Sequence, residues 1–190
     1  MLVPGCVCAL VPRLHTRTHL VLVLHAAEAK KPTNTGRLAA LCCDNSRVLV
    51  RGLPDQPLEL AFLAGQNAAI LCPEEGAKLL EPSRDPLTLV VPDGSWRQAS
   101  KMSRREPMLR NLPRVCLPAL PARAPELRRE TKDGGLATFV AIARALGILE
   151  GAACEQALLK FYDVLAERIL LARQGQPTPK GPLTREGGEQ

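Results

Sequence analysis

The sequence predicts an α/β protein built on a mostly parallel sheet flanked by helices. Short runs of leucine and valine, such as HLVLVL and LTLVV, are typical of strands that are covered on both faces. These runs alternate with segments of helical periodicity, the order expected of a parallel α/β fold. The chain has 190 residues, 46% of them hydrophobic, which is enough for one domain with its own core.

Strands and helices are expected to alternate along most of the chain. We expect strands at residues 18–24, 46–50, 68–71, 87–91 and 114–117. We expect helices at residues 36–43, 77–80, 94–105, 136–149 and 155–172, of which the last two are the most clearly amphipathic. Thr35 and Asp93 are the expected N-caps of the first and third helices. Residues 30–37 and 118–135 carry the Pro and Gly of loops.

The domain is expected to span residues 1–173. Residues 174–190 are rich in Gly and Pro without apolar periodicity, so we expect a disordered tail there. No apolar run is long enough to cross a membrane. Arg13 and Arg17 precede a short apolar run, as in a signal peptide, but His25 interrupts the run and favours a buried strand instead. Seven scattered cysteines indicate reduced thiols and a cytoplasmic protein.

Positive charge is concentrated in one segment of the chain. Residues 97–132 contain ten basic and three acidic residues, whereas the whole chain has a net charge of +6. Arg97, Lys101 and Arg104 share one face of the expected helix 94–105. Clustered basic residues beside a ligand turn are typical of phosphate binding, and RNA is the partner that they favour. The alternative is a solvated face that only keeps the protein in solution.

Three turns are candidates for ligand binding. Asp93, Gly94, Ser95 and Trp96 follow the strand at 87–91, so the chain leaves the core and presents a carboxylate, a glycine and the only Trp. The alternative is an Asp N-cap followed by a core Trp. The turn at 72–76 follows another strand, at the edge where parallel sheets bind ligands. Glycines at 131–135 leave backbone N–H groups free for an anion, although an ordinary helix entry has the same pattern.

The cysteines do not predict a metal site. Cys6 and Cys8 have the spacing of half a zinc site, but a structural zinc ion needs four ligands. Cys42 and Cys43 are adjacent on an expected helix and would point in different directions. We therefore expect no bound metal.

Taken together, the motifs resemble the DTW-domain family of tRNA-uridine aminocarboxypropyltransferases. The matching stretches, in family order, are CVCALVPRL, KKPTNTGRL, VVPDGSWRQASKM, LRNLPRVCL and LRRETKDGGLATFVAIARAL. Asp93 and Trp96 match the Asp and Trp of the family signature, and Ser95 stands in place of its Thr. The family usually has a CxxC pair upstream of the CxC, and the given sequence starts too late to contain it. Either the start is truncated or this branch lacks the metal, so Cys6 and Cys8 alone leave the expected zinc site incomplete.

The resemblance implies a SPOUT-like fold with a trefoil knot in the C-terminal half and S-adenosylmethionine bound in loops of the knot. The residues that it assigns to this co-substrate are Cys72, Pro73, Gly76, Pro92, Asp93, Gly94, Ser95, Leu127, Arg128, Thr131 and Gly135. The residues that it assigns to tRNA are Lys31, Asn34, Thr35, Arg37, Arg97, Lys101 and Arg104. No obligate protein partner is implied.

The implied reaction transfers the 3-amino-3-carboxypropyl group from S-adenosylmethionine to N3 of a uridine in tRNA and releases methylthioadenosine. Asp93 would take the N3 proton, and Trp96 would wall the site or stack on a base. Arg128 or Arg129 would hold the carboxylate of the methionine moiety. The alternatives are a SPOUT-type RNA methyltransferase and an RNA-binding protein without catalysis, because the fold alone does not separate them.

Overall fold

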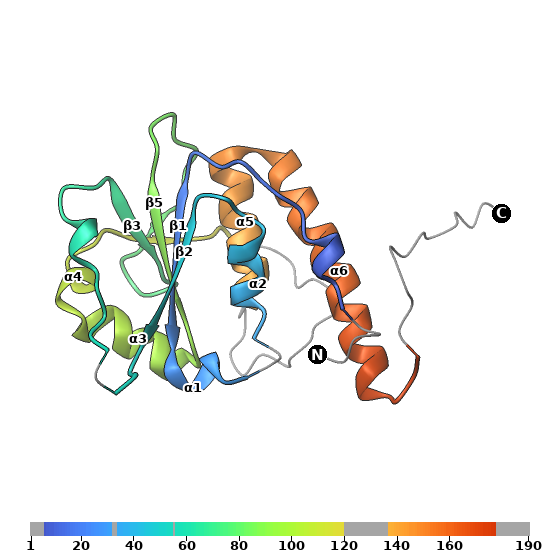
Figure 1. Ribbon diagram of the computed structural model, residues 1–190. Helices are drawn as coiled ribbons and strands as arrows, with labels where there is room; N and C mark the ends of the chain where they lie inside the picture. Colours follow the sequence, from blue (N-terminus) through green and yellow to red (C-terminus); the bar gives the residue numbers. More distant parts are fainter. Residues whose placement is uncertain (1–5, 32–33, 55, 120–136, 178–190) are drawn as a thin grey trace.

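The computed structural model describes residues 6–31, 34–54, 56–119 and 137–177 (Figure 1). A six-stranded sheet forms its centre, and every paired strand in it is parallel. The strand order is β2-β1-β5-β3-β6-β4. The strands are β1 (His19–His25), β2 (Ser46–Arg51), β3 (Ala68–Leu71), β4 (Lys78–Leu79), β5 (Thr88–Asp93) and β6 (Arg114–Cys116). The expected class, a mostly parallel sheet flanked by helices, is therefore confirmed.

The helices cover both faces of this sheet. Five of the described helical elements are short: α1 (Ala26–Ala29), α2 (Gly36–Leu41) and α4 (Pro107–Arg110), together with the 3-10 turns η2 (Cys8–Leu10) and η3 (Ala61–Leu63). The longer helices are α3 (Trp96–Arg105), α5 (Thr138–Glu150) and α6 (Ala152–Arg173). In Figure 1, α2, α5 and α6 lie on one side of the sheet, and α3 and α4 lie on the other.

Alternation along β1 divides the core into two layers. Leu20 and Leu22 pack in the cluster that includes α2, α5 and α6, whereas Val21 and Val23 pack against Met102 of α3 on the opposite face. All four side chains are fully buried. Because successive strand residues point to opposite faces, a run of apolar residues is what a strand covered on both faces requires.

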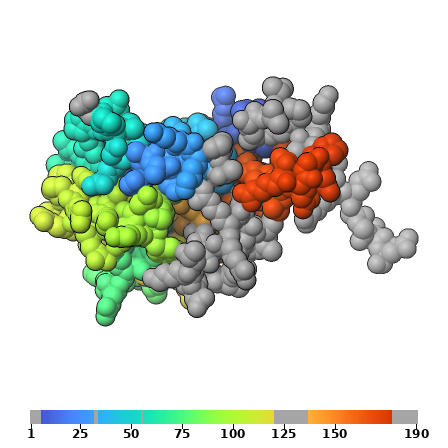
Figure 2. All heavy atoms as spheres, turned by 90° about the horizontal axis from the view of Figure 1, so that it is seen from below, coloured from blue at the N-terminus to red at the C-terminus, as the bar shows by residue number. Residues whose placement is uncertain are grey.

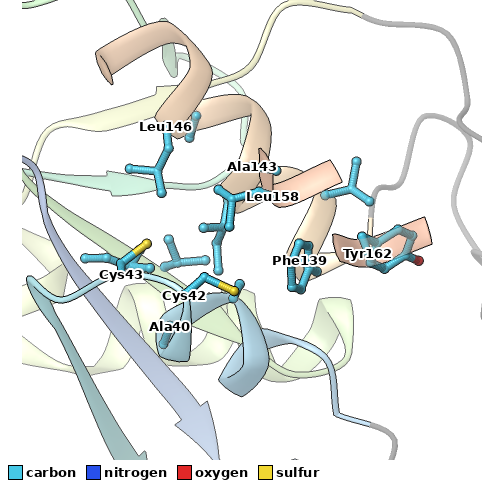
Figure 3. Packing of buried hydrophobic residues seen from close by; sticks show 14 of the residues in the cluster. Ala40, Cys42, Cys43, Phe139, Ala143, Leu146, Leu158 and Tyr162 are labelled. Atoms are coloured by element: carbon cyan, nitrogen blue, oxygen red, sulfur yellow. The ribbon is translucent and has the colours of Figure 1, made fainter. Parts of the chain in front are cut away.

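The larger layer is closed by the two C-terminal helices. Figure 3 shows Phe139 of α5 beside Tyr162 of α6, with the thiols of Cys42 and Cys43 among the aliphatic side chains. The ring centroids of Phe139 and Tyr162 are 5.2 Å apart, within the range of favourable aromatic pairs. Phe161 of α6 also packs on Phe139, and most of the other side chains in this layer are aliphatic.

The topology places a switch point between β1 and β5, which are adjacent in the sheet. From β1 the chain passes through α2, on one face, to β2. From β5 it passes through α3 and α4, on the opposite face, to β6. In the strand order, β2 lies next to β1 toward one edge of the sheet, and β6 lies beyond β3 toward the other edge. The loops after β1 and β5 therefore diverge at their carboxyl ends, and open α/β sheets bind ligands in that crevice.

Two local expectations are wrong. Residues 77–80 form no helix; Lys78 and Leu79 instead pair with β6 as a short edge strand. Asp93 is not the N-cap of α3, because it ends β5 and Ser95 caps the helix.

Other expectations stay predictions. The tail at 174–190 lies mostly outside the described residues, as does most of the loop at 118–135. The trefoil knot also stays a prediction, because residues 120–136 join β6 to α5 and are not described. Within the described ranges, no helix is both long enough and apolar enough to span a membrane.

Candidate functional site

Asp93 is the centre of the site at the switch point. Its Oδ2 accepts a hydrogen bond from Nδ2 of Asn34 at 2.7 Å, and its Oδ1 accepts one from the Thr138 hydroxyl at 2.6 Å. Asn34 precedes α2, and Thr138 begins α5. Asp93 is only 5% exposed. The carboxylate therefore joins three segments that are far apart in the sequence: the end of β5, the loop before α2 and the start of α5.

Gly36 lies directly against this carboxylate. A Cβ atom on Gly36 would lie 2.6 Å from Asp93 Oδ2 and 3.2 Å from Thr138 Cγ2. Real side chains do not come that close, so only glycine lets the first turn of α2 approach Asp93. Asn34 also uses its Oδ1 to accept a hydrogen bond from the Arg37 backbone N–H at 3.2 Å, which places its amide between the start of α2 and Asp93.

The next residues form the start of α3. Ser95 accepts a hydrogen bond from the Gln98 N–H, and Gln98 Oε1 accepts one from the Ser95 N–H at 2.8 Å, which together make a capping box. A Cβ on Gly94 would lie 2.9 Å from Gln98 Cβ and 3.4 Å from His25 Cβ. The glycine therefore gives room to the capping side chain on one side and to the end of β1 on the other.

His25 brings the end of β1 to the same place. Its Nδ1 accepts a hydrogen bond from the Ala27 N–H at 3.1 Å and caps α1. The neutral ring therefore carries its proton on Nε2, as a donor. Figure 2 looks onto the face of the molecule where α1 and α3 lie, and shows the residues after β1 (blue) beside those of α3 (lime green).

Glu74, in the turn after β3, anchors α3 from its other side. Its Oε1 accepts a hydrogen bond from the Ser100 hydroxyl at 2.9 Å and lies 3.4 Å from an Arg104 nitrogen. Its Oε2 pairs with Arg114 Nε at 3.2 Å. Partial burial of Glu74 raises its pKa, but the bond from Ser100 and the charges of the two arginines outweigh this, and the net effect is a lowered pKa. Glu74 is therefore ionised at neutral pH and fixes α3 to β3 and β6.

The residues expected to contact tRNA differ in whether the fold already occupies their side chains. Arg97 and Lys101 are exposed on α3, and so is Arg105, which the sequence analysis did not select. Arg104 is bonded to Glu74, Lys31 pairs with Glu28, and Arg37 donates to the Ala29 carbonyl.

Asn34 differs from the other residues of this set, because it is 8% exposed and its amide donates to Asp93. Its contact with tRNA stays a prediction. Thr35 occupies the N-cap position of α2 but makes no capping hydrogen bond with its side chain.

The residues expected to bind the co-substrate are brought together only in part. Pro92, Asp93, Gly94 and Ser95 lie at the switch point, while Cys72, Pro73 and Gly76 follow β3, the neighbouring strand of β5. Cys72 is buried, and Gly76 has a positive φ of 80° that suits glycine. Leu127, Arg128, Thr131 and Gly135 lie outside the described residues. Trp96 is half-buried in the first turn of α3.

Sequence reasoning missed His25, Gly36 and Thr138 as parts of the site. For His25 a signal was present, because it directly follows a buried strand, at the edge where parallel sheets bind ligands. Gly36 and Thr138 lie in stretches that match the family, but nothing in those stretches indicates their contacts with Asp93, which is distant in the sequence.

The thiols are divided between the surface and the core. Cys6 and Cys8 are exposed, and Cys42, Cys43 and Cys72 are buried. Burial raises the pKa of Cys42 and of Cys43 to about 12 and that of Cys154 to about 11. Among the described residues, no three His, Cys, Asp or Glu side chains gather as a metal site would require.

A parallel sheet flanked by helices, with polar loops gathered at its switch point, defines an open α/β protein. Within this class the chain belongs to the DTW domain family, whose model matches residues 1–170. The family membership expected from the motifs is thus confirmed.

Two curated relatives carry the same name, tRNA-uridine aminocarboxypropyltransferase 2. The protein from Macaca fascicularis is 30% identical over 157 residues, which cover 76% of this chain and 53% of the relative. The protein from Mus musculus is 28% identical over 166 residues, which cover 81% of this chain and 56% of the relative. The chain thus spans about half the length of these relatives. No solved structure matches it significantly.

Proposed function

We propose that the chain transfers the 3-amino-3-carboxypropyl group of S-adenosylmethionine to N3 of a uridine in tRNA. The observation that carries the proposal is the meeting of the family's motifs at one place in the fold. Asn34 and Gly36 of KKPTNTGRL, Asp93 and Gly94 of VVPDGSW, and Thr138 of GGLATF lie in contact at the switch point between β1 and β5. The names of the relatives support transfer of an aminocarboxypropyl group to a uridine of tRNA. The donor and the N3 position are what the resemblance to the family implies.

The chemistry requires positioning above all. The N3 lone pair attacks the methylene carbon next to the sulfonium on the aminocarboxypropyl arm. The C–S electron pair passes to sulfur, methylthioadenosine leaves as a neutral thioether, and the N3 proton goes to a base. The sulfonium is already a good leaving group, so the site must chiefly hold the two reactants in line. Asp93 is the base that the sequence predicts.

The polar groups at the switch point suit a small zwitterionic co-substrate. The loop at Pro92–Ser95 leaves the sheet beside His25, whose Nε2–H is available to an acceptor. The Trp96 indole, in the first turn of α3, supplies a planar apolar surface for adenine or for a base of the RNA. Arg128 and Arg129, outside the described residues, remain the candidates for the carboxylate of the methionine moiety.

The by-product of S-adenosylmethionine tests this proposal. The protein is incubated with the co-substrate and unmodified tRNA, and the nucleoside products are separated chromatographically. We expect methylthioadenosine in amounts that rise with tRNA. S-adenosylhomocysteine in its place would make the chain a methyltransferase. The absence of both would leave it an RNA-binding protein without catalysis.

A further inference from the structure

We propose that Asp93 is a positioning residue, whose buried carboxylate holds the loop before α2 and the first turn of α5 against the end of β5. In this arrangement it forms a clamp, defined here as Asp93 with Asn34, Gly36 and Thr138. The proposal deepens the function proposed above and rests on it only where activity is measured. It differs from the sequence-based prediction, in which Asp93 takes the N3 proton.

The first argument is the desolvation of the carboxylate. A 5% exposed carboxylate has lost most of its water, which is costly unless hydrogen bonds replace it. The Asn34 amide and the Thr138 hydroxyl donate to opposite oxygens at 2.7 and 2.6 Å. Both groups donate to carboxylate oxygens, and hydrogen bonds donated to an ionised carboxylate are of the stronger, charge-assisted kind.

The second argument is the space around Oδ2. This oxygen accepts from Asn34 and lies where a Cβ on Gly36 would be only 2.6 Å away. The carboxylate therefore packs against the backbone of α2 as well as bonding to the loop before it. A general base must come within hydrogen-bond reach of the proton that it removes, whereas this carboxylate faces the protein's own segments on both sides.

The third argument is what the clamped segments are. The loop before α2 leaves β1, and α5 follows the segment that contains Arg128, Thr131 and Gly135. By holding the loop before α2 and the first turn of α5 at the switch point, the carboxylate orders the site without touching the substrate. Loss of the clamp should therefore weaken binding of the co-substrate, because the free protein would have to pay the ordering cost on binding.

The two roles predict opposite rankings of two variants. The amide of Asp93→Asn cannot take up a proton. Its carbonyl oxygen can still accept the hydrogen bond from Asn34, and its NH2 group can donate one to the Thr138 hydroxyl oxygen, since a hydroxyl both donates and accepts. It removes the base and keeps the clamp. Thr138→Val has nearly the same shape and leaves the Asp93 carboxylate in place, but lacks the donor. It removes one arm of the clamp and keeps the base.

The experiment compares these variants with Thr138→Ser, which restores the hydroxyl, and with Thr88→Val as matched control. Thr88 is also buried, at the opposite end of the same strand. Three quantities are measured in the full chain: hydrogen exchange of the amides at residues 34–38 and 138–141, the Kd of S-adenosylmethionine, and kcat and KM for transfer to tRNA.

The clamp predicts that Thr138→Val accelerates exchange at both segments and raises the Kd by about tenfold, the effect of one lost hydrogen bond. Thr138→Ser and Thr88→Val should exchange like the wild type at these amides. Asp93→Asn should lose no more of the kcat/KM for transfer to tRNA than Thr138→Val does. In both variants the loss should appear as a raised KM rather than a lowered kcat. If Thr138→Val does not fold, Asn34→Ala removes the other arm.

The proposal is overturned if Thr138→Val exchanges and binds like Thr88→Val. It is equally overturned if Asp93→Asn binds the co-substrate normally and loses about 10²–10⁴ in kcat, the loss expected of a missing general base. Failure of the proposed function gives a different result: the wild-type protein then shows no transfer to tRNA. Hydrogen exchange of the amides at 34–38 and 138–141 still tests the clamp in that case.

Discussion

At the scale of single residues, each of the first three residues of the tetrapeptide Asp93-Gly94-Ser95-Trp96 has a distinct structural role. Asp93 holds two distant segments, Gly94 gives room to the Gln98 side chain, and Ser95 caps α3. The Ser in place of the family's Thr keeps the hydroxyl that the cap requires, because both residues serve as N-caps. The substitution is therefore compatible with the local fold.

The thiols provide a residue-scale prediction. Hydrogen bonds from Cys8 lower the pKa of Cys6, whereas burial raises the pKa of Cys42 and of Cys43 to about 12. The thiolate is the reactive form, so at about pH 8 native protein should be alkylated at Cys6 far faster than at Cys42 or Cys43. Timed labelling with iodoacetamide, followed by peptide mass spectrometry, measures each rate.

Unfolding supplies the control for this labelling. In guanidinium chloride all seven thiols should react at similar rates, since burial is then lost. Rapid labelling of Cys42 or Cys43 in the native protein would contradict the packing of that layer.

At the scale of elements, α3 carries a line of three basic residues that begins at the site. Arg97, Lys101 and Arg105 are spaced four residues apart, so they lie along one side of the helix, and all three are exposed. Within the described part of the chain, none of them is in an ion pair. Arg104, in contrast, is bonded to Glu74. The structure therefore favours Arg105 over Arg104 for contact with phosphate.

Neighbouring arginines make a matched pair for this prediction. Arg105→Gln should weaken tRNA binding and lower the slope of log K against log salt by somewhat less than one unit. Arg104→Gln should leave both nearly unchanged. Filter binding at several salt concentrations measures the two variants. An Arg105→Gln variant that binds tRNA with unchanged affinity and salt slope would show that the exposed line on α3 is only a solvated face. Equal losses in the two variants would contradict the preference for Arg105 over Arg104.

Glu74 gives a prediction for the dependence of stability on pH. Its folded-state pKa lies below its ordinary value of 4.5, so the carboxylate stabilises the fold above that pH and loses this contribution as the pH falls. Glu74→Gln should cost about 1 kcal/mol near pH 7, a modest value because Arg104 is largely exposed. Urea unfolding at about pH 7 and at a series of pH values below 4.5 should show the difference between the two proteins shrinking as the pH falls. A constant difference would mean that the ion pairs contribute nothing.

The elements also show how far the sequence could predict the fold. The buried strands were predictable because runs such as HLVLVL fit only a strand covered on both faces. The two-residue strand β4 was not, since it exists only through its pairing with β6. The N-cap of α3 was misassigned to Asp93 although Ser95 followed three residues later by Gln98 is the sequence pattern of a capping box.

The position of the candidate site could be predicted from the sequence, but only some of the residues that form it could be. The Asp93 turn could be selected because it follows a buried strand at the carboxyl edge. Its partners could not, because the bond between Thr138 and Asp93 joins residues 45 positions apart, and nothing local marks such a contact. The resemblance to the family assigns Asn34 to tRNA, whereas the structure shows it buried with its amide on Asp93.

At the scale of the whole molecule, the site follows from the order of the strands. The helices after β1 and β5 lie on opposite faces of the sheet, and this opens a crevice between two adjacent strands at their carboxyl ends. The same edge receives the start of α3, so the exposed basic line leads away from the place where the family's motifs meet. Under the proposed function, this edge is where a small co-substrate and an RNA would meet.

Mass spectrometry of the tRNA nucleosides tests the central claim most directly. The protein is incubated with tRNA and with S-adenosylmethionine that carries ¹³C throughout its aminocarboxypropyl arm, and the tRNA is then digested to nucleosides. We expect a uridine derivative that contains the complete labelled arm, and no such product without the protein. A methylated nucleoside without the label, or unmodified uridine throughout, would contradict the claim.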